Sequence, residues 1–311
     1  MLRKILVTGG AGFIGSHLVD ALVAEGHDVV VVDNFCSGST ANLTQASGPV
    51  RVIRADIRDP EAWAEEVGQV DTIVHLAALI SGYDSLFDPD AYDDVNIRGL
   101  MRVIEFAAER KVPRILFASS STVYGNQEGR ALTESSPVKP LTFYALTKLA
   151  GENMLRLYGE LHGFSHCSLR LFNVYGPRQA VDHPYANVTC KFSHAAAAGL
   201  PISCYGDGNQ SRDFVFVDDV VRAFLAVLNS SGEAIYNIGT GCSASINDLI
   251  QSLGNIRGAP LAVDQRDPWP NDIRSIEADP SLFANEFGFR PEVSLASGLE
   301  RTVAFFNAQN G

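Results

Sequence analysis

The chain has 311 residues, which is enough for one large domain or two smaller ones. Apolar residues make up 46% of the sequence, so a sizeable core can form, yet no apolar run is long enough to span a membrane. The formal net charge of −12 argues against nucleic acid as a general partner, because phosphate binding needs a basic surface. The sequence therefore predicts neither a nucleic-acid nor a membrane partner, and a phosphate-bearing ligand would need locally placed arginines.

The cysteines predict neither disulfides nor a metal site. There are five of them, an odd number, and they are scattered without C-x-x-C spacing. This usage is typical of reduced thiols, so we predict a cytoplasmic protein. No group of His, Cys, Asp and Glu has metal-ligand spacing, so no metal is expected.

A glycine turn follows the first predicted strand. Residues 4–8 form a short β-rich run, and residues 16–25 form an amphipathic stretch typical of a helix. Between them, glycines recur at every third position, which lets the backbone approach a pyrophosphate and points a helix N-terminus at it. We predict that this turn binds a dinucleotide through Gly9, Gly12, Phe13, Ile14 and Gly15.

An acidic residue closes the second predicted strand, residues 28–32. Asp33 lies about 20 residues beyond the turn, where a carboxylate accepts hydrogen bonds from an adenosine ribose. Asn34 follows, and no arginine stands beside it to bind a 2′-phosphate, so the pattern favours NAD over NADP. A purely structural turn with an exposed aspartate is the less favoured interpretation.

The third predicted strand, residues 50–55, also ends at an acidic residue. Asp56 and Ile57 follow it at the sheet edge where an adenine would lie, and we assign both to the cofactor. For Asp56, capping a helix is an equally good interpretation.

The fourth predicted strand, residues 71–75, ends at a histidine. His75 is more typical of a hydrogen-bonded core histidine than of a ligand contact. Further along, Asn96 falls inside a predicted helix over residues 94–109, where asparagine is mildly disfavoured, so it either packs as a polar group or supports a site. Small residues after the strand over residues 71–75 let the backbone approach the cofactor, and we assign Leu76, Ala77 and Ala78 to cofactor binding.

Hydroxyl groups follow the fifth predicted strand, residues 113–118. The run Ser119-Ser-Ser-Thr-Val-Tyr-Gly125 lies at the ligand-binding edge of a parallel sheet, although serine runs are also common in plain loops. Downstream, Tyr144 and Lys148 are four apart, so on a helix they share one face. A phenol has a pKa of about 10, and a nearby ammonium favours its phenolate, so Tyr144 is a candidate base for a sugar hydroxyl.

These motifs resemble the extended short-chain dehydrogenases/reductases, and within them the NAD-dependent nucleotide-sugar epimerases and dehydratases. The resemblance covers nearly the whole chain, and the motifs fall in the family's order and spacing. It implies a catalytic triad of Ser120, Tyr144 and Lys148, of which the last two also contact the cofactor. Asn34 and Asn96 are assigned to the cofactor as well, and Asn96 matches the family's supporting asparagine. It further implies a homodimer that pairs the helices over residues 94–109 and 142–162.

The same resemblance implies which residues bind a UDP-sugar. A sixth strand is predicted over residues 165–171, a substrate-covering segment over residues 179–204, and a seventh strand over residues 233–239. Arg212 and Arg274 match the family's diphosphate arginines, because a guanidinium binds two phosphate oxygens at once. Each arginine alone is more typical of a surface salt bridge. The full set assigned to the substrate is Ser121, Thr122, Asn173, Arg178, Val188, Arg212 and Arg274.

Alternating strands and helices predict an α/β fold: a doubly wound parallel sheet of the Rossmann type with a second, smaller lobe. We expect an NAD-binding domain over residues 1–175, to which the chain returns near residues 212–240. Residues 176–311 are then the substrate-binding lobe.

The reaction is predicted from the two residues after the catalytic hydroxyl. Dehydratases of this family usually carry an Asp-Glu pair there, whereas this chain has Ser121 and Thr122, which favours 4-epimerisation. UDP-glucose and UDP-galactose rank first and UDP-glucuronate second, with Arg178 as the candidate cation for a uronate. Ile276 matches a position that gates bulky 2-substituents, but its intermediate size decides little. A 4,6-dehydratase and a non-catalytic NAD-binding regulator remain as alternatives.

Overall fold

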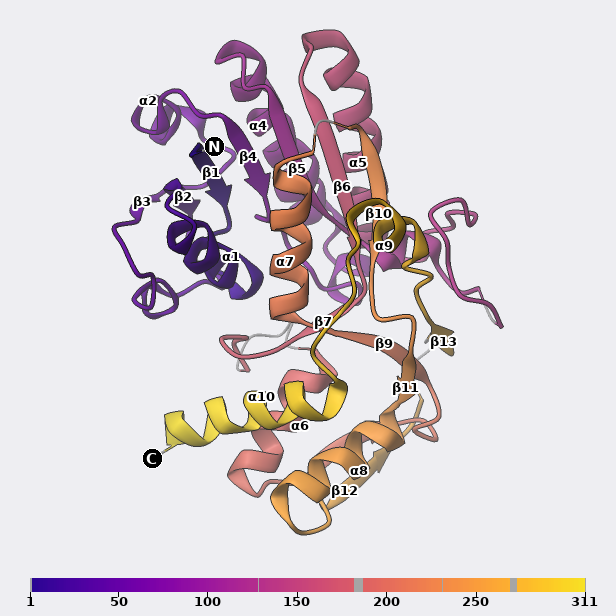
Figure 1. Cartoon of the computed structure of the whole chain (residues 1–311). Coiled ribbons are helices and arrows are strands. Elements are labelled where there is room, and N and C mark those ends of the chain that lie inside the picture. The colour runs from indigo at the N-terminus through magenta and orange to yellow at the C-terminus, as the bar shows by residue number, and fades with distance from the viewer. Residues whose placement is uncertain (1, 128, 182–186, 231, 269–272, 311) are drawn as a thin grey trace. The chain divides into compact units, whose positions relative to one another are not determined.

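A computed structural model describes residues 2–127, 129–181, 187–230, 232–268 and 273–310 (Figure 1). The chain forms two compact units. Unit 1 comprises residues 1–123, 140–170 and 221–236, and unit 2 comprises residues 124–139, 171–220 and 237–311. The assignment of residues 1–175 to the cofactor and of residues 176–311 to the substrate concerns function, and it stays a prediction.

Unit 1 is built on a seven-stranded sheet with the strand order β10-β6-β5-β4-β1-β2-β3. The pairs β1–β2, β1–β4, β2–β3 and β4–β5 are parallel. The strand order reverses between β1 and β4, which is the switch point of a doubly wound sheet. The predicted fold class is confirmed. The strands are β1 Lys4–Thr8, β2 Asp28–Asp33, β3 Arg51–Arg54, β4 Thr72–His75, β5 Arg114–Ser120, β6 Ser165–Leu171 and β10 Ala234–Ile238.

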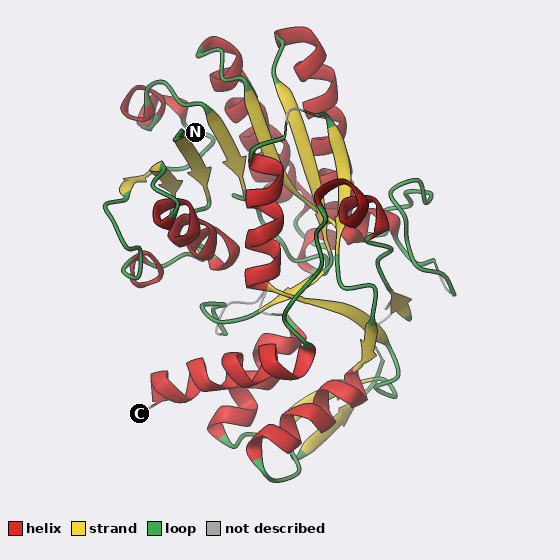
Figure 2. Cartoon of the chain, in the orientation of Figure 1, coloured by secondary structure: helices red, strands yellow, loops and turns green. Residues whose placement is uncertain are grey.

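Helices cover both faces of this sheet (Figures 1 and 2). In these views α1 lies in front of the strands, while α4 and α5 lie behind them. Central strands such as β1 and β2 are buried almost throughout, which explains their unbroken apolar runs. The helices are α1 Phe13–Ala24, α2 Ala64–Val67, α3 Pro89–Tyr92, α4 Gly99–Glu109 and α5 Phe143–His162, with α7 Val217–Leu228 belonging mostly to this unit.

The helix predicted over residues 94–109 is not uniform. Residues Asp93–Arg98 are π-helical, and only then does α4 begin at Gly99. A π-helical turn inserts an extra residue and often marks a functional site. Here it holds Asn96, which is 5% exposed, and the sequence pattern alone could not show the insertion.

Unit 2 contains two small sheets. In the first, β9 Ser211–Phe216 pairs with β7 Asn173–Tyr175, β11 Ser243–Ser245 and β13 Ser275–Ile276. In the second, β8 Ile202–Tyr205 pairs in parallel with β12 Val263–Arg266. The predicted substrate-covering segment 179–204 contains α6 and the start of β8, and its residues 182–186 lie outside the described part. The helices are α6 Val188–Ala198, α8 Ile246–Arg257, α9 Ser281–Phe287 and α10 Leu295–Asn310.

None of the helices in the described part of the chain combines the length and apolar character needed to cross a membrane. Among the same residues, no group of three or more His, Cys, Asp or Glu side chains could hold a metal ion.

Candidate active site

The glycine turn after β1 has room for backbone only. Gly9 has a φ of +73°, and a Cβ there would lie 2.7 Å from the Ala77 nitrogen. A Cβ on Gly15 would lie 2.2 Å from the Gly9 oxygen. The turn opens α1, which begins at Phe13 and has no acidic residue in its first turn. These residues fit a dinucleotide diphosphate, which needs close backbone approach and the positive end of a helix dipole.

Asp33 lies at the end of β2, beside this turn. Its two carboxylate oxygens accept hydrogen bonds from the backbone nitrogens of Ala11 (2.9 Å) and Phe35 (2.8 Å). Burial raises the pKa of Asp33, while the two amide bonds and the charge of Arg54 oppose that shift. The carboxylate is thus held in a fixed orientation at the sheet edge, as ribose binding requires.

An arginine does stand beside Asp33, although the neighbouring sequence contains none. Arg54 is in register with Asp33 across the β2–β3 pair. Its guanidinium carbon lies 4.4 Å from the centre of the Phe35 ring. The absence of a local arginine was therefore an incomplete reason to prefer NAD, because parallel strands bring together residues distant in sequence.

Asp56 and Ile57 have different surroundings. The pKa of Asp56 is lowered to about 2, chiefly by hydrogen bonding to the Arg58 side chain. Burial opposes this shift, and hydrogen bonds from the Arg58 amide and Asn34 add to it. Asn34 donates to Asp56 over 2.9 Å, so the two residues form one polar edge. Ile57 is 5% exposed and belongs to the hydrophobic core of unit 1. A cofactor contact from either residue stays a prediction.

His75 is a core residue, which is the interpretation that the sequence favoured. Its Nδ1 is 2.8 Å from the Thr8 hydroxyl, and its ring stacks on Phe117. Burial and the nearby Lys148 lower the pKa of His75 to about 3, so it is neutral. The following segment lies against the glycine turn: the amide of Leu76 donates to the Thr8 carbonyl, and Ala77 is in contact with Gly9.

Tyr144 and Lys148 share one face of α5, as predicted. The Lys148 Nζ lies 5.8 Å from the centre of the Tyr144 ring and donates to the Ala118 carbonyl over 2.8 Å. Tyr144 is 9% and Lys148 is 4% exposed. Burial raises the pKa of Tyr144 to about 12, although a hydrogen bond with Ser120 lowers it. Burial also lowers the pKa of Lys148 to about 8.

The expectation that Lys148 keeps the phenol pKa low is therefore wrong for the protein alone. Desolvation of the phenolate is the larger effect, and Ser120 provides the opposing hydrogen bond. Ser120, Tyr144 and Lys148 nevertheless come together at the carboxyl end of β5, within one buried group.

Side chains bind both the amide and the carbonyl of the Tyr144 main chain. Its amide donates to the Ser85 hydroxyl over 3.0 Å, and its carbonyl accepts from the Thr147 hydroxyl over 2.8 Å. Thr147 in turn accepts from Asn96 Nδ2 over 3.0 Å. Asn96 also bonds both the amide and the carbonyl of Leu79, so it joins the segment after β4 to α5. This geometry links the two segments, while a cofactor contact from Asn96 stays a prediction.

A buried ion pair lies one turn further along α5, and sequence reasoning missed it. Glu152 accepts two hydrogen bonds from Arg170 of β6, at 2.9 and 2.7 Å, and one from the Ser119 hydroxyl. Both charged side chains are at most 5% exposed. The signal was a glutamate four residues after Lys148, on the buried face of the helix.

The predicted substrate residues lie in unit 2, apart from Ser121 and Thr122. Arg212 pairs in register with Ile276 on the β9–β13 ladder. Arg274 directly precedes β13, and its carbonyl accepts a hydrogen bond from the Ser211 amide at 2.9 Å, so the two arginines belong to adjoining parts of this sheet. Arg274 donates to both carboxylate oxygens of Asp207, which lowers the pKa of Asp207.

The remaining predicted residues come from three segments of unit 2. Asn173 begins β7 and pairs with Phe214. Arg178 has a φ of 67°, an uncommon backbone conformation for a non-glycine residue. Val188 opens α6 directly after Asn187, whose side chain caps the helix and also donates to the Val174 carbonyl. The predicted site residues thus fall into two sets, one in each unit.

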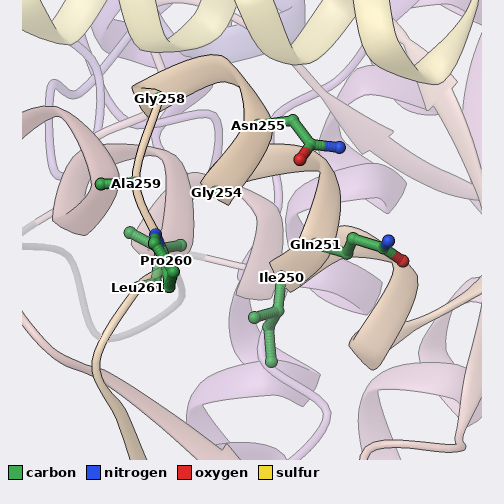
Figure 3. Close-up of a pocket in the computed structure, with 8 residues that line it drawn as sticks. All are labelled: Ile250, Gln251, Gly254, Asn255, Gly258, Ala259, Pro260 and Leu261. Carbon is green, nitrogen blue, oxygen red and sulfur yellow. The ribbon is translucent and has the colours of Figure 1, made fainter.

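A surface pocket in unit 2 lies beside the end of α8 (Figure 3). The amides of Gln251 and Asn255 point away from the loop over residues 258–261 in that view. None of the predicted site residues lines this pocket, which is formed by Ile250, Gln251, Gly254, Asn255 and residues 258–261.

A dinucleotide cradle joined to a buried Ser–Tyr–Lys group defines a short-chain dehydrogenase/reductase-type enzyme. The model of the NAD dependent epimerase/dehydratase family matches residues 5–239, and the chain belongs to that family. The predicted family and its NAD cofactor are therefore confirmed.

Similar proteins align over nearly full length. A UDP-glucose 4-epimerase of Mycolicibacterium smegmatis is 39% identical over 97% of this chain and 98% of its own. The structure of a UDP-glucose 4-epimerase of Thermotoga maritima with UDP-glucose has a TM-score of 0.94 and 34% identity, and covers 99% of this chain and 100% of its own. That of Thermus thermophilus UDP-glucose 4-epimerase with NAD has a TM-score of 0.90 and 35% identity, over 97% and 98%.

Proposed function

We propose that this protein is a nucleotide-sugar 4-epimerase that interconverts UDP-glucose and UDP-galactose. The observation that carries the proposal is the buried group of Ser120, Tyr144 and Lys148 at the sheet edge that also bears the glycine turn. Similar proteins support the choice of sugar, since one relative is described as a UDP-glucose 4-epimerase and another as a putative UDP-glucose 4-epimerase.

When bound, oxidised NAD would supply a reversible hydride acceptor for the sugar C4 and a positive charge that favours the phenolate. Tyr144 takes the O4 proton as the C4–O4 double bond forms and gives it back when that bond is reduced. In this proposal, Lys148 holds a positive charge near the phenol and binds the nicotinamide ribose. Asp33 holds the adenosine ribose.

Residues of unit 2 bind the rest of the substrate in this proposal. Arg212 and Arg274 bind the diphosphate, because both lie at the β9–β13 pair and a guanidinium matches phosphate geometry. Asn173 contacts the substrate near its phosphates, and Val188 also contacts the substrate. The Asp207–Arg274 pair is about half exposed on each side chain, so solvent screens it and a dianionic ligand can compete for the arginine.

UDP-glucuronate is the second candidate substrate. The structure of MoeE5 in complex with UDP-glucuronic acid and NAD has a TM-score of 0.89 to this chain at 33% identity. Arg178, in its unusual backbone conformation, is the cation that would bind the uronate carboxylate.

The test is to incubate purified protein, without added NAD, with UDP-glucose, UDP-galactose, UDP-N-acetylglucosamine and UDP-glucuronate. Products are separated by anion-exchange chromatography, and bound NAD is measured after denaturation. We expect conversion of UDP-glucose, and loss of turnover with NAD still bound in Tyr144→Phe. A matched control is Tyr158→Phe, the same change elsewhere on α5, where the ring stacks on His162. Full activity of Tyr144→Phe refutes the catalytic assignment, a 4-keto-6-deoxy product indicates a 4,6-dehydratase, and NAD without turnover indicates a regulator.

A homodimer through α4 and α5 is part of the proposal. On α5, Leu146, Leu157 and Leu161 are 47%, 54% and 68% exposed, and they recur at helical spacing along one stripe. Such a stripe on a charged protein is suited to pairing with a second copy. Leu157→Glu should shift the protein to a monomer in sedimentation, and an unchanged dimer would contradict this interface. A cytoplasmic location also stays a prediction.

A further inference from the structure

Thr122 contacts the catalytic hydroxyl twice. Ser120 is the last residue of β5, and Thr122 follows in the short 3-10 turn Ser121–Tyr124. The Ser120 Oγ accepts a hydrogen bond from the Thr122 amide at 3.2 Å and another from the Thr122 hydroxyl at 2.9 Å. Both donors belong to one residue, so the turn itself fixes their positions.

A serine hydroxyl has one proton to donate and two lone pairs that accept. Thr122 fills both acceptor positions of Ser120. Ser120 is 7% exposed, so water has little access to replace either bond. The hydrogen bond from Ser120 that lowers the pKa of Tyr144 then uses the one remaining function of Ser120, which is its proton.

We propose that Thr122 is a positioning residue that fixes the direction of the Ser120 hydrogen bond, so that Ser120 donates to the Tyr144 phenol oxygen. The proposal rests on the proposed function. It selects between two routes for the substrate proton. A relay through Ser120 would need Ser120 to accept from the sugar O4, and Thr122 occupies the positions for that. The O4 proton therefore passes directly to Tyr144.

The direction of this bond matters for the base. A donor aimed at the phenol oxygen favours the phenolate, which burial otherwise disfavours. In a buried site a hydrogen bond to a charged group is stronger than in water.

Thr122→Val tests the proposal because it removes the hydroxyl but keeps the shape and the backbone amide. In the enzyme with its bound NAD, we expect the acidic, rising limb of the kcat/KM pH profile to move to higher pH by about one unit, with about a tenfold loss at neutral pH. KM for the sugar should change little. Thr122→Ser should restore the profile. Thr133→Val, the same change at a loop threonine that bonds Ser135 and Ser136, is the control.

A double-variant cycle separates positioning from folding. If Thr122 acts through Ser120, Thr122→Val adds nothing in a Ser120→Ala background. Additive losses of activity in the double variant, or a lower kcat/KM without a shift in the pH profile, overturn the proposal. The tyrosinate absorbance of the protein minus that of Tyr144→Phe reports the titration of Tyr144 in the absence of any substrate. It should move to higher pH in Thr122→Val even if no sugar is turned over, so a failure of the proposed function is distinguishable from a failure of this inference.

Discussion

The Glu152–Arg170 pair offers a sharp test of how α5 is fixed beneath the active site. Glu152→Gln removes the negative charge, keeps the side-chain size, and places an amide where Arg170 now finds a carboxylate oxygen. Breaking a buried ion pair by changing one partner costs about 3–5 kcal/mol. The two side chains are 2% and 5% exposed, so the full penalty should apply.

The same helix provides the control. Arg156 and Glu160 form an ion pair at 3.2 Å whose side chains are 58% and 61% exposed. An exposed pair of this kind contributes about 0.5 kcal/mol or less, so Glu160→Gln should be nearly silent. Urea unfolding, together with hydrogen exchange of the α5 amides, measures both variants.

We expect Glu152→Gln to lose several kcal/mol and Glu152→Leu/Arg170→Met to recover most of that loss, since replacing both charges by apolar groups is often neutral. If Glu152→Gln were no less stable than Glu160→Gln, the pair would not fix α5 in the way we infer.

Three further variants test the site. The folded pKa of Lys148, about 8, lies below its ordinary 10.5, so between these values the unfolded chain binds more protons and stability rises with pH. This contribution, about 3 kcal/mol, should be missing from Lys148→Met in urea titrations at pH 7 and pH 10. Ser85→Ala removes the acceptor of the Tyr144 amide, at a cost of about 1 kcal/mol, so kcat should fall about fivefold with KM and bound NAD unchanged. A fall in bound NAD instead would place Ser85 in cofactor binding. Gly15→Ala forces a Cβ to 2.2 Å from the Gly9 oxygen and should yield protein without NAD, whereas Gly254→Ala, where the nearest atom is 3.5 Å away, should keep it.

Much of unit 1 could be predicted because its signals are local. The strands at residues 4–8 and 165–171 are buried runs whose bounds agree with the sequence pattern. The glycine turn depends on steric exclusion within a few residues, so its spacing indicates its shape. Tyr144 and Lys148 meet because helical periodicity alone brings them together.

The features that could not be predicted depend on contacts between distant segments. Arg54 reaches Asp33 only through the register of two parallel strands. Arg170 meets Glu152 through the packing of β6 against α5, and Asp207 meets Arg274 across 67 residues. The π-helical turn at Asn96 inserts a residue that composition does not reveal. The phenol pKa was predicted in the wrong direction because sequence shows a nearby charge but not the burial that outweighs it.

The most direct measurement follows the hydrogen at the sugar C4. Purified protein is incubated with UDP-glucose deuterated at C4, in ordinary water and without added NAD, and the product is examined by NMR and mass spectrometry. Transient oxidation by a tightly held cofactor, with Tyr144 handling only the O4 proton, predicts UDP-galactose that keeps its deuterium at C4. Deuterium lost to solvent, or found at C6 of a dehydrated sugar, would contradict it.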